Sequence, residues 1–71
     1  MIVYENDEYA VSQSEINKHI MIIKKLPDDK GKMIFHCQRN ETEPMLTQEQ
    51  GKKFLQNVLD LIGLRTGFGL E

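Results

Sequence analysis

The stretch that decides the fold is residues 47–62, which read TQEQGKKFLQNVLDLI. Thr47 is a residue type that favours the N-cap of a helix, and Gln50, three positions later, completes a capping box. Apolar side chains then recur at the spacing of one helix face, at Phe54, Leu55, Val58, Leu59, Leu61 and Ile62. The sequence therefore predicts a C-terminal amphipathic helix that buries this stripe against the rest of the chain.

Two glycines mark special positions of the predicted helix. Gly63 follows the last apolar residue and suits the left-handed C′ position, where Leu64 would contact Leu59 in a Schellman ending. Gly51 lies inside the helix, at a cost of about 1 kcal/mol relative to alanine. We expect Gly51 to permit close approach of the helix to a sheet.

The N-terminal residues read as a β-hairpin. Two short β-prone runs, IVY and YAV, flank the polar turn ENDE at residues 5–8. We expect Tyr4 to pair with Tyr9 and Ile2 with Val11, which puts all four side chains on the same face.

Residues 12–25 fit two structures. Ser12 and Glu15 match a capping box, and Ile16, Ile20 and Ile23 fall at helical spacing. The run IMII that begins at Ile20 is instead rich in β-branched residues, which favour strands. We favour the strand, because a second hairpin can be built on it.

The turn of that second hairpin is predicted at residues 27–32, which read PDDKGK. Pairing Leu26 with Met33 sends alternate residues to opposite faces. One face then collects Ile20, Ile22, Leu26, Met33, Phe35 and Cys37. The other face collects His19, Met21, Ile23, Lys25, Ile34, His36 and Gln38.

These elements predict an α+β fold. We expect a small antiparallel β-sheet of three to four strands in two hairpins, with one C-terminal α-helix packed on one face. Residues 1–69 are expected to form a single small domain. The last two residues, Leu-Glu at 70–71, are read as an expression-tag remnant.

The order of elements resembles that of a known family. Strands, then Leu46-Thr47-x-x-Gln50, then a terminal helix is similar to the order in single-strand nucleic-acid binders related to transcriptional positive cofactor four. The resemblance is one of topology over part of the chain. Because a fold alone does not determine function, no functional residue is carried over.

The composition is that of a globular protein. The chain is 39% hydrophobic and 28% charged with a formal net charge of −2, which fits a globular protein without a strong field toward nucleic acid. The start of the chain lacks a signal-peptide pattern, and the longest apolar run covers only residues 20–23. We therefore expect a cytoplasmic protein without membrane association.

The sequence offers little catalytic chemistry. His36 and Cys37 are adjacent, but neighbours in a strand point to opposite faces and cannot act as a base–nucleophile pair. A single cysteine also excludes an internal disulfide. His19 and His36 share a face in the expected register, yet two histidines without a clear third ligand make a weak metal site. We expect no catalytic residue, no metal, no cofactor and no enzyme activity.

Two function hypotheses remain. In the first, Met21, Ile23 and Ile34, with His36, face away from the helix and form an interface. The chain is then a non-enzymatic protein-interaction module, homodimeric at micromolar concentration or bound to another protein. In the second, a hairpin rich in lysine binds nucleic acid. Its candidate contacts are Lys24, Lys25, Lys30 and Lys32.

Overall fold

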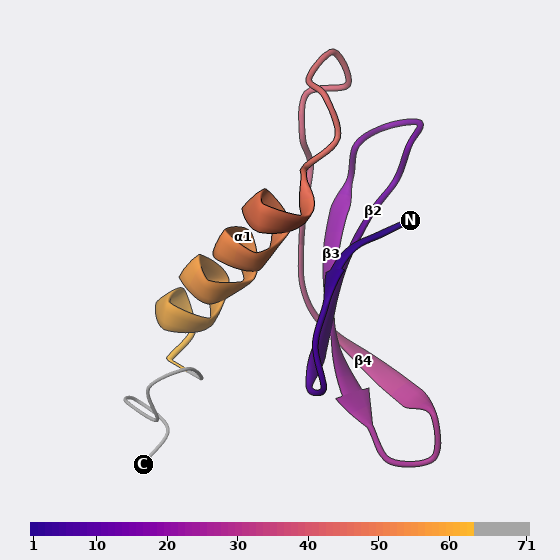
Figure 1. Ribbon diagram of the computed structural model, residues 1–71, viewed down its shortest axis with the longest axis vertical. Helices are drawn as coiled ribbons and strands as arrows, with labels where there is room; N and C mark the ends of the chain where they lie inside the picture. The colour runs from indigo at the N-terminus through magenta and orange to yellow at the C-terminus, as the bar shows by residue number, and fades with distance from the viewer. Residues whose placement is uncertain (64–71) are drawn as a thin grey trace.

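The computed structural model describes residues 1–63 of the chain. Its elements are β1 (Ile2–Glu5), β2 (Tyr9–Gln13), β3 (Ile20–Leu26), β4 (Lys30–Cys37) and α1 (Gln48–Leu61). The four strands form one antiparallel sheet in the order β1-β2-β3-β4, so each strand pairs with its neighbour in sequence. Figure 1 shows α1 lying along one side of this sheet. The predicted α+β fold, with one helix on one sheet face, is confirmed.

The core lies between α1 and the sheet. Its buried side chains are Tyr9, Val11, Ile20, Ile22, Leu55, Val58 and Leu59. The helix packs mainly against β1 and β2. It reaches β4 through Phe54, whose ring meets that of Phe35 edge-on at a centroid distance of 6.0 Å. The helix therefore covers one face of the sheet most fully over its first two strands.

Both ends of α1 carry the predicted signals. The Thr47 hydroxyl accepts a hydrogen bond from the Gln50 amide at 3.1 Å, and the Gln50 side-chain oxygen accepts one from the Thr47 amide at 2.9 Å. Gly63 has a φ of 79°, as expected for the left-handed C′ position. The expected contact of Leu64 lies outside the described residues. Within residues 1–63, no helix has the length and apolarity needed to cross a membrane.

The predicted apolar stripe is confirmed in its middle and wrong at its end. Leu55, Val58 and Leu59 are buried, whereas Leu61 is 78% exposed and Ile62 is 38% exposed. Leu61 follows Leu59 by two positions, a rotation of about 200° around the helix axis, and so turns away from the sheet. Ile62 is the C-cap residue, beyond the last residue of the helix.

Gly51 lets α1 approach β1 closely, as predicted. A Cβ atom built on Gly51 would lie 3.1 Å from Cβ of Tyr4 and 3.1 Å from Cγ2 of Val3. Real Cβ atoms seldom come this near to neighbouring atoms. The missing side chain therefore sets the packing distance between the helix and the first strand.

The first hairpin forms as expected, but its strands pair in a different register from the predicted one. Tyr4 pairs with Val11 rather than with Tyr9, and an irregularity in β1 leaves Ile2 opposite Ser12. The Asn6 side-chain oxygen accepts hydrogen bonds from the amides of Glu8 and Tyr9, both at 2.8 Å, which shapes the turn. Tyr4 and Val11 stay on the core face, while Ile2 is 49% exposed.

The segment that fitted both helix and strand is resolved in favour of the strand. Its first residues end β2, its last residues belong to β3, and a turn connects the two. The Ser14 hydroxyl accepts hydrogen bonds from the amides of Ile16 and Asn17, at 3.2 and 3.4 Å. Ser14 therefore stabilises a tight turn, while Ser12, the expected helix cap, lies in β2.

The second hairpin has a tighter turn than predicted. Leu26 pairs with Lys30 instead of Met33, so the loop is Pro27–Asp29. Asp28 and Asp29 both have positive φ, at 65° and 60°. Positive φ is uncommon for residues other than glycine, but aspartate tolerates it better than most, which suits both residues to this tight loop.

An irregularity in β4 returns the second half of that strand to the sheet face that the sequence predicted for it. Ile23 pairs with Met33 and Ile22 pairs with Phe35, which leaves Ile34 as the extra residue of a bulge. Beyond the bulge, Phe35 and Cys37 share the core face with Ile22 and Ile20, as predicted. Before the bulge, Met33 lies on the opposite face, where it was not expected.

Candidate interaction surface

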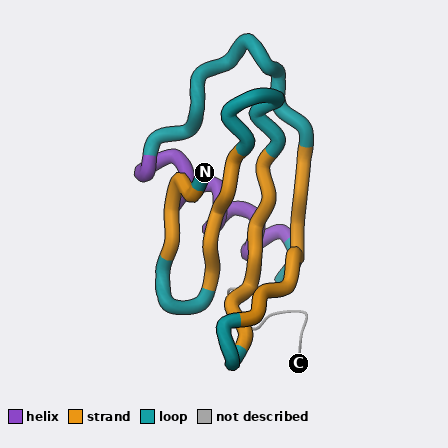
Figure 2. The backbone as a smooth tube through the Cα atoms, turned by 90° about the vertical axis from the view of Figure 1, so that its right-hand side faces the viewer, coloured by secondary structure: helices purple, strands orange, loops and turns teal. Residues whose placement is uncertain are grey.

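The sheet face away from α1 consists of two rows of side chains that cross all four strands. Figure 2 looks onto the four strands with the helix behind them. The first row is Glu5, Ala10, Ile23 and Met33. The second row is Ile2, Ser12, Met21 and His36. We call the residues of these two rows the outer face.

The middle of the outer face is apolar and partly open to solvent. Met33 is 52% exposed, Ile2 is 49% exposed and Met21 is 36% exposed. Ile23 is half-buried and lies over Gly31, where an added Cβ would come within 2.8 Å of its Cγ2 atom. The outer face thus has an apolar centre in which Ile23 packs over Gly31.

Three of the four predicted interface residues lie together on this face. Met21 and His36 pair directly, and Ile23 lies in the neighbouring row. The fourth, Ile34, is a correction, because it packs against the core cluster. The bulge shifts the alternation of β4 by one residue, so Met33 takes the position opposite Ile23. The sequence pattern contained no signal for this bulge, and so Met33 was missed.

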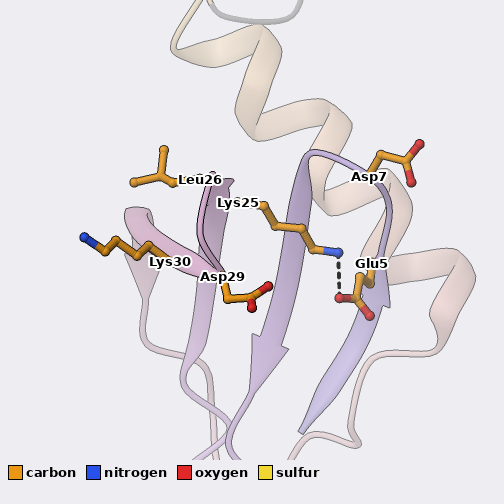
Figure 3. A pocket seen from close by; sticks show the side chains of 6 residues that line it. All are labelled: Glu5, Asp7, Lys25, Leu26, Asp29 and Lys30. Atoms are coloured by element: carbon orange, nitrogen blue, oxygen red, sulfur yellow. Dashed lines mark ion pairs between the residues drawn. The ribbon is translucent and has the colours of Figure 1, made fainter.

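A charged pair borders the apolar centre at one end. The Lys25 ammonium lies 2.7 Å from a carboxylate oxygen of Glu5, and both side chains are partly exposed (Figure 3). Because such an exposed pair contributes little to stability, its main effect is on the charge of the surface. One acid and one base leave this end of the outer face without net charge.

A pair of histidines borders the other end. Nε2 of His19 lies 3.3 Å from Nδ1 of His36, and the ring centroids are 5.3 Å apart. His19 is positioned by its backbone, because its amide donates to the Asn17 side chain at 3.0 Å and its carbonyl accepts from Ser14 at 2.9 Å. Within residues 1–63, no group of three or more His, Cys, Asp or Glu side chains could hold a metal ion.

The four lysines of the predicted nucleic-acid site do not all share one face, because Lys25 lies on the opposite face of the hairpin from the other three. Lys24 lies over the Tyr9 ring at 4.9 Å, and Lys25 is held by Glu5. Lys30 and Lys32 make no ion pair among the described residues. Figure 3 shows Lys25 reaching toward Glu5 while Lys30 points away from that pair.

The hairpin also forms one side of an open hollow of about 460 Å³. Its lining mixes acidic and basic side chains with one leucine: Glu5, Asp7, Lys25, Leu26, Asp29 and Lys30. The three carboxylates lower the positive potential that the lysines would otherwise create there. This region is therefore a mixed-charge surface rather than a basic groove.

Cys37 lies on the core side of β4, as the alternation predicted, with His36 on the outer face. Cys37 is half-buried. β4 is an edge strand, so no further strand covers its far side. The thiol packs against the core cluster and stays separated from the imidazole of His36 by the sheet.

Gln13 is a structural residue that the sequence did not reveal. It is fully buried, its side-chain amide donates to the Lys18 carbonyl at 3.2 Å, and its side-chain oxygen accepts from the Leu46 amide at 2.9 Å. Gln13 therefore ties the turn before β3 to the residues that lead into α1. A polar residue at the end of a strand carries no local sign of partners this distant in sequence.

Comparison with known proteins identifies no relative. No protein-family model, no curated protein and no solved structure matches this chain. Function must therefore be argued from the outer face itself.

Proposed function

We propose that this chain is a non-enzymatic interaction module that forms a homodimer through its outer face. The observation that carries the proposal is the apolar centre of that face, where Ile2, Met21 and Met33 are exposed and α1 packs on the opposite side. Contiguous apolar side chains with a polar rim are typical of protein–protein interfaces.

A second copy of the chain suits this surface better than a strongly charged partner. In a twofold dimer the same patch faces itself, so each charge must find its opposite within the patch. Lys25 and Glu5 lie side by side at the rim and supply one charge of each sign. A twofold arrangement can set Lys25 of one copy against Glu5 of the other.

The expected dimer is weak. The exposed side chains are already about half covered, so association recovers only about half of the roughly 1.5–3 kcal/mol that full burial of each would give. Association itself costs about 4 kcal/mol or more. We expect dimers to form as the protein concentration rises from about 1 µM to about 1 mM.

Sedimentation equilibrium in the presence of EDTA tests the proposal. The apparent mass should rise above 8.3 kDa with concentration. Met21→Glu and Met33→Glu should each abolish that rise, because a carboxylate at the centre of the interface would be buried without a partner. Leu61→Glu is the matched control, since Leu61 is equally apolar and 78% exposed but lies on α1.

Two controls show whether a loss of association comes from the outer face or from unfolding. Circular dichroism should show that all three glutamate variants remain folded, because each replaces a side chain that is at least 36% exposed. A mass of 8.3 kDa at every concentration would refute the homodimer. So would an equal loss of association in Leu61→Glu, since the outer face would then not be responsible.

One observation favours nucleic-acid binding as a second candidate. Strand alternation places Lys24, Lys30 and Lys32 on one face of the β3–β4 hairpin, whose tip extends away from α1 (Figure 1). Contacts to about three phosphates of a single strand predict a log–log salt slope near −2. Fluorescence anisotropy with a labelled single-stranded oligonucleotide measures this slope. The absence of binding at low salt would refute the candidate.

A further inference from the structure

The two histidines at the border of the outer face have the spacing of metal ligands. Zinc binds imidazole nitrogens at about 2.0–2.1 Å in tetrahedral geometry, which places two nitrogens on one ion about 3.3 Å apart. Nε2 of His19 and Nδ1 of His36 are 3.3 Å apart. Ligands at right angles, as in square-planar or octahedral ions, would lie closer, at about 3.0 Å. The separation of the two nitrogens therefore matches that of two ligands on one tetrahedral ion.

The remaining ring nitrogens permit this use of the pair. Nδ1 of His19 and Nε2 of His36 make no hydrogen bond among the described residues. Each neutral ring can therefore carry its proton on that outward nitrogen. The lone pairs of the two facing nitrogens are then both available to a metal. A direct N–H···N hydrogen bond between the rings is the competing explanation.

A tetrahedral site needs four ligands, and the pair supplies two. Within residues 1–63 no third His, Cys, Asp or Glu completes the set. His36 is part of the outer face, and His19 contacts it at the border of that face. A twofold dimer through this face whose axis passes beside the pair would bring the same pair from a second copy, because residues at the axis face their own copies.

We propose that His19 and His36 form half of a zinc site that two copies of the chain complete, with four imidazole ligands for one ion. The inference rests on the proposed dimer for its second pair of ligands. It assigns to the dimer a metal dependence that apolar contact alone does not give. A ligand set of neutral imidazoles suits zinc, and its geometry selects zinc over larger oxygen-binding ions.

The test uses the full chain freed of metal with EDTA and then dialysed. Calorimetric titration with zinc chloride should give one zinc per two chains. Sedimentation equilibrium in zinc should show the mass moving toward twice 8.3 kDa at concentrations where EDTA leaves monomers. His19→Gln and His36→Gln should each lower the zinc affinity by at least about tenfold, since loss of even an outer-shell partner has this effect.

A substitution of Cys37 tests whether zinc binds to the histidine pair or to the thiol. Cys37→Ser should bind zinc as the unmodified protein does, because Cys37 lies on the opposite side of the sheet from His36. The inference is overturned if zinc does not bind, if it binds at one per chain without a change of mass, or if it binds undiminished to His36→Gln.

The outcome is independent of the test of the apolar dimer. Dimers that form in EDTA and bind no zinc would support the proposed function and overturn the shared zinc site. Monomers in EDTA that zinc converts to dimers would support the zinc site and refute association by apolar contact alone.

Discussion

Replacing Gln13 by methionine isolates the contribution of its two side-chain hydrogen bonds. Methionine has nearly the same length and volume, so it fills the buried space without a cavity. It can neither donate to the Lys18 carbonyl nor accept from the Leu46 amide, which Gln13 serves at 3.2 and 2.9 Å. The substitution therefore leaves one acceptor and one donor without their protein partner.

The magnitude follows from the surroundings of those two groups. A fully buried polar group left unpaired costs about 1–3 kcal/mol. Lys18 and Leu46 are only half-buried, so water can partly replace the lost partner and the lower end applies. We expect Gln13→Met to lower the free energy of unfolding by about 2 kcal/mol, from a total that is about 4–11 kcal/mol for a chain of this length.

Urea unfolding followed by circular dichroism measures this loss. Gln38→Met is the matched control, since Gln38 is exposed just after β4 and should change stability by less than about 0.5 kcal/mol. Gln13→Glu should be worse than Gln13→Met at neutral pH, because it keeps an acceptor but buries a charge facing the Lys18 carbonyl. If Gln13→Met were as mild as Gln38→Met, the two hydrogen bonds would not hold the turn and the helix entry together.

Three further substitutions test local features by the same urea assay. Thr47→Ala removes the N-cap acceptor of α1 and should cost about 1 kcal/mol; an unchanged stability would contradict the capping role. Gly51→Ala should lower the free energy of unfolding by about 1 kcal/mol, because overpacking against β1 outweighs the gain in helix propensity. Asn57→Ala, on the exposed side of the helix, is its control and should be mildly stabilising. Asp29→Gly removes the steric cost of a φ of 60° and should stabilise the fold by about 0.5 kcal/mol. Asp7→Gly is its control and should not stabilise the fold, because the φ of Asp7 is not positive.

The helix was predictable because its signals are local. Thr47 and Gln50 lie within one turn of each other, and the capping box depends on nothing beyond them. Gly51 was also interpretable from its position alone, since only a close neighbour explains a glycine in a helix interior. The predicted stripe was too broad at Leu61, because the helix period itself turns that residue about 200° away from Leu59.

Register was not predictable, because turn geometry sets it and strand composition does not. Two aspartates with positive φ shortened the second turn, and a bulge at Ile34 then returned half of β4 to its expected face. A shift of one residue moves a side chain to the other face of a sheet. This is why Met21, Ile23 and His36 were placed together from sequence, while Ile34 and Met33 exchanged roles.

Contacts between distant segments were beyond the reach of the sequence pattern. The sequence placed His19 and His36 on one face, but their 3.3 Å contact also depends on the turn before β3, which was itself ambiguous. The hydrogen bonds of Gln13 likewise depend on three segments meeting at one point. Such residues become visible only when the sheet is assembled.

The strand order has a consequence for how the chain folds. Every strand pairs with its immediate neighbour in sequence, so the sheet can grow through short loop closures that are fast and cost little entropy. The helix instead packs chiefly on the first two strands, across the full length of the intervening chain. During synthesis the sheet can therefore emerge with its core face bare, and that face stays open to aggregation until α1 leaves the ribosome and docks.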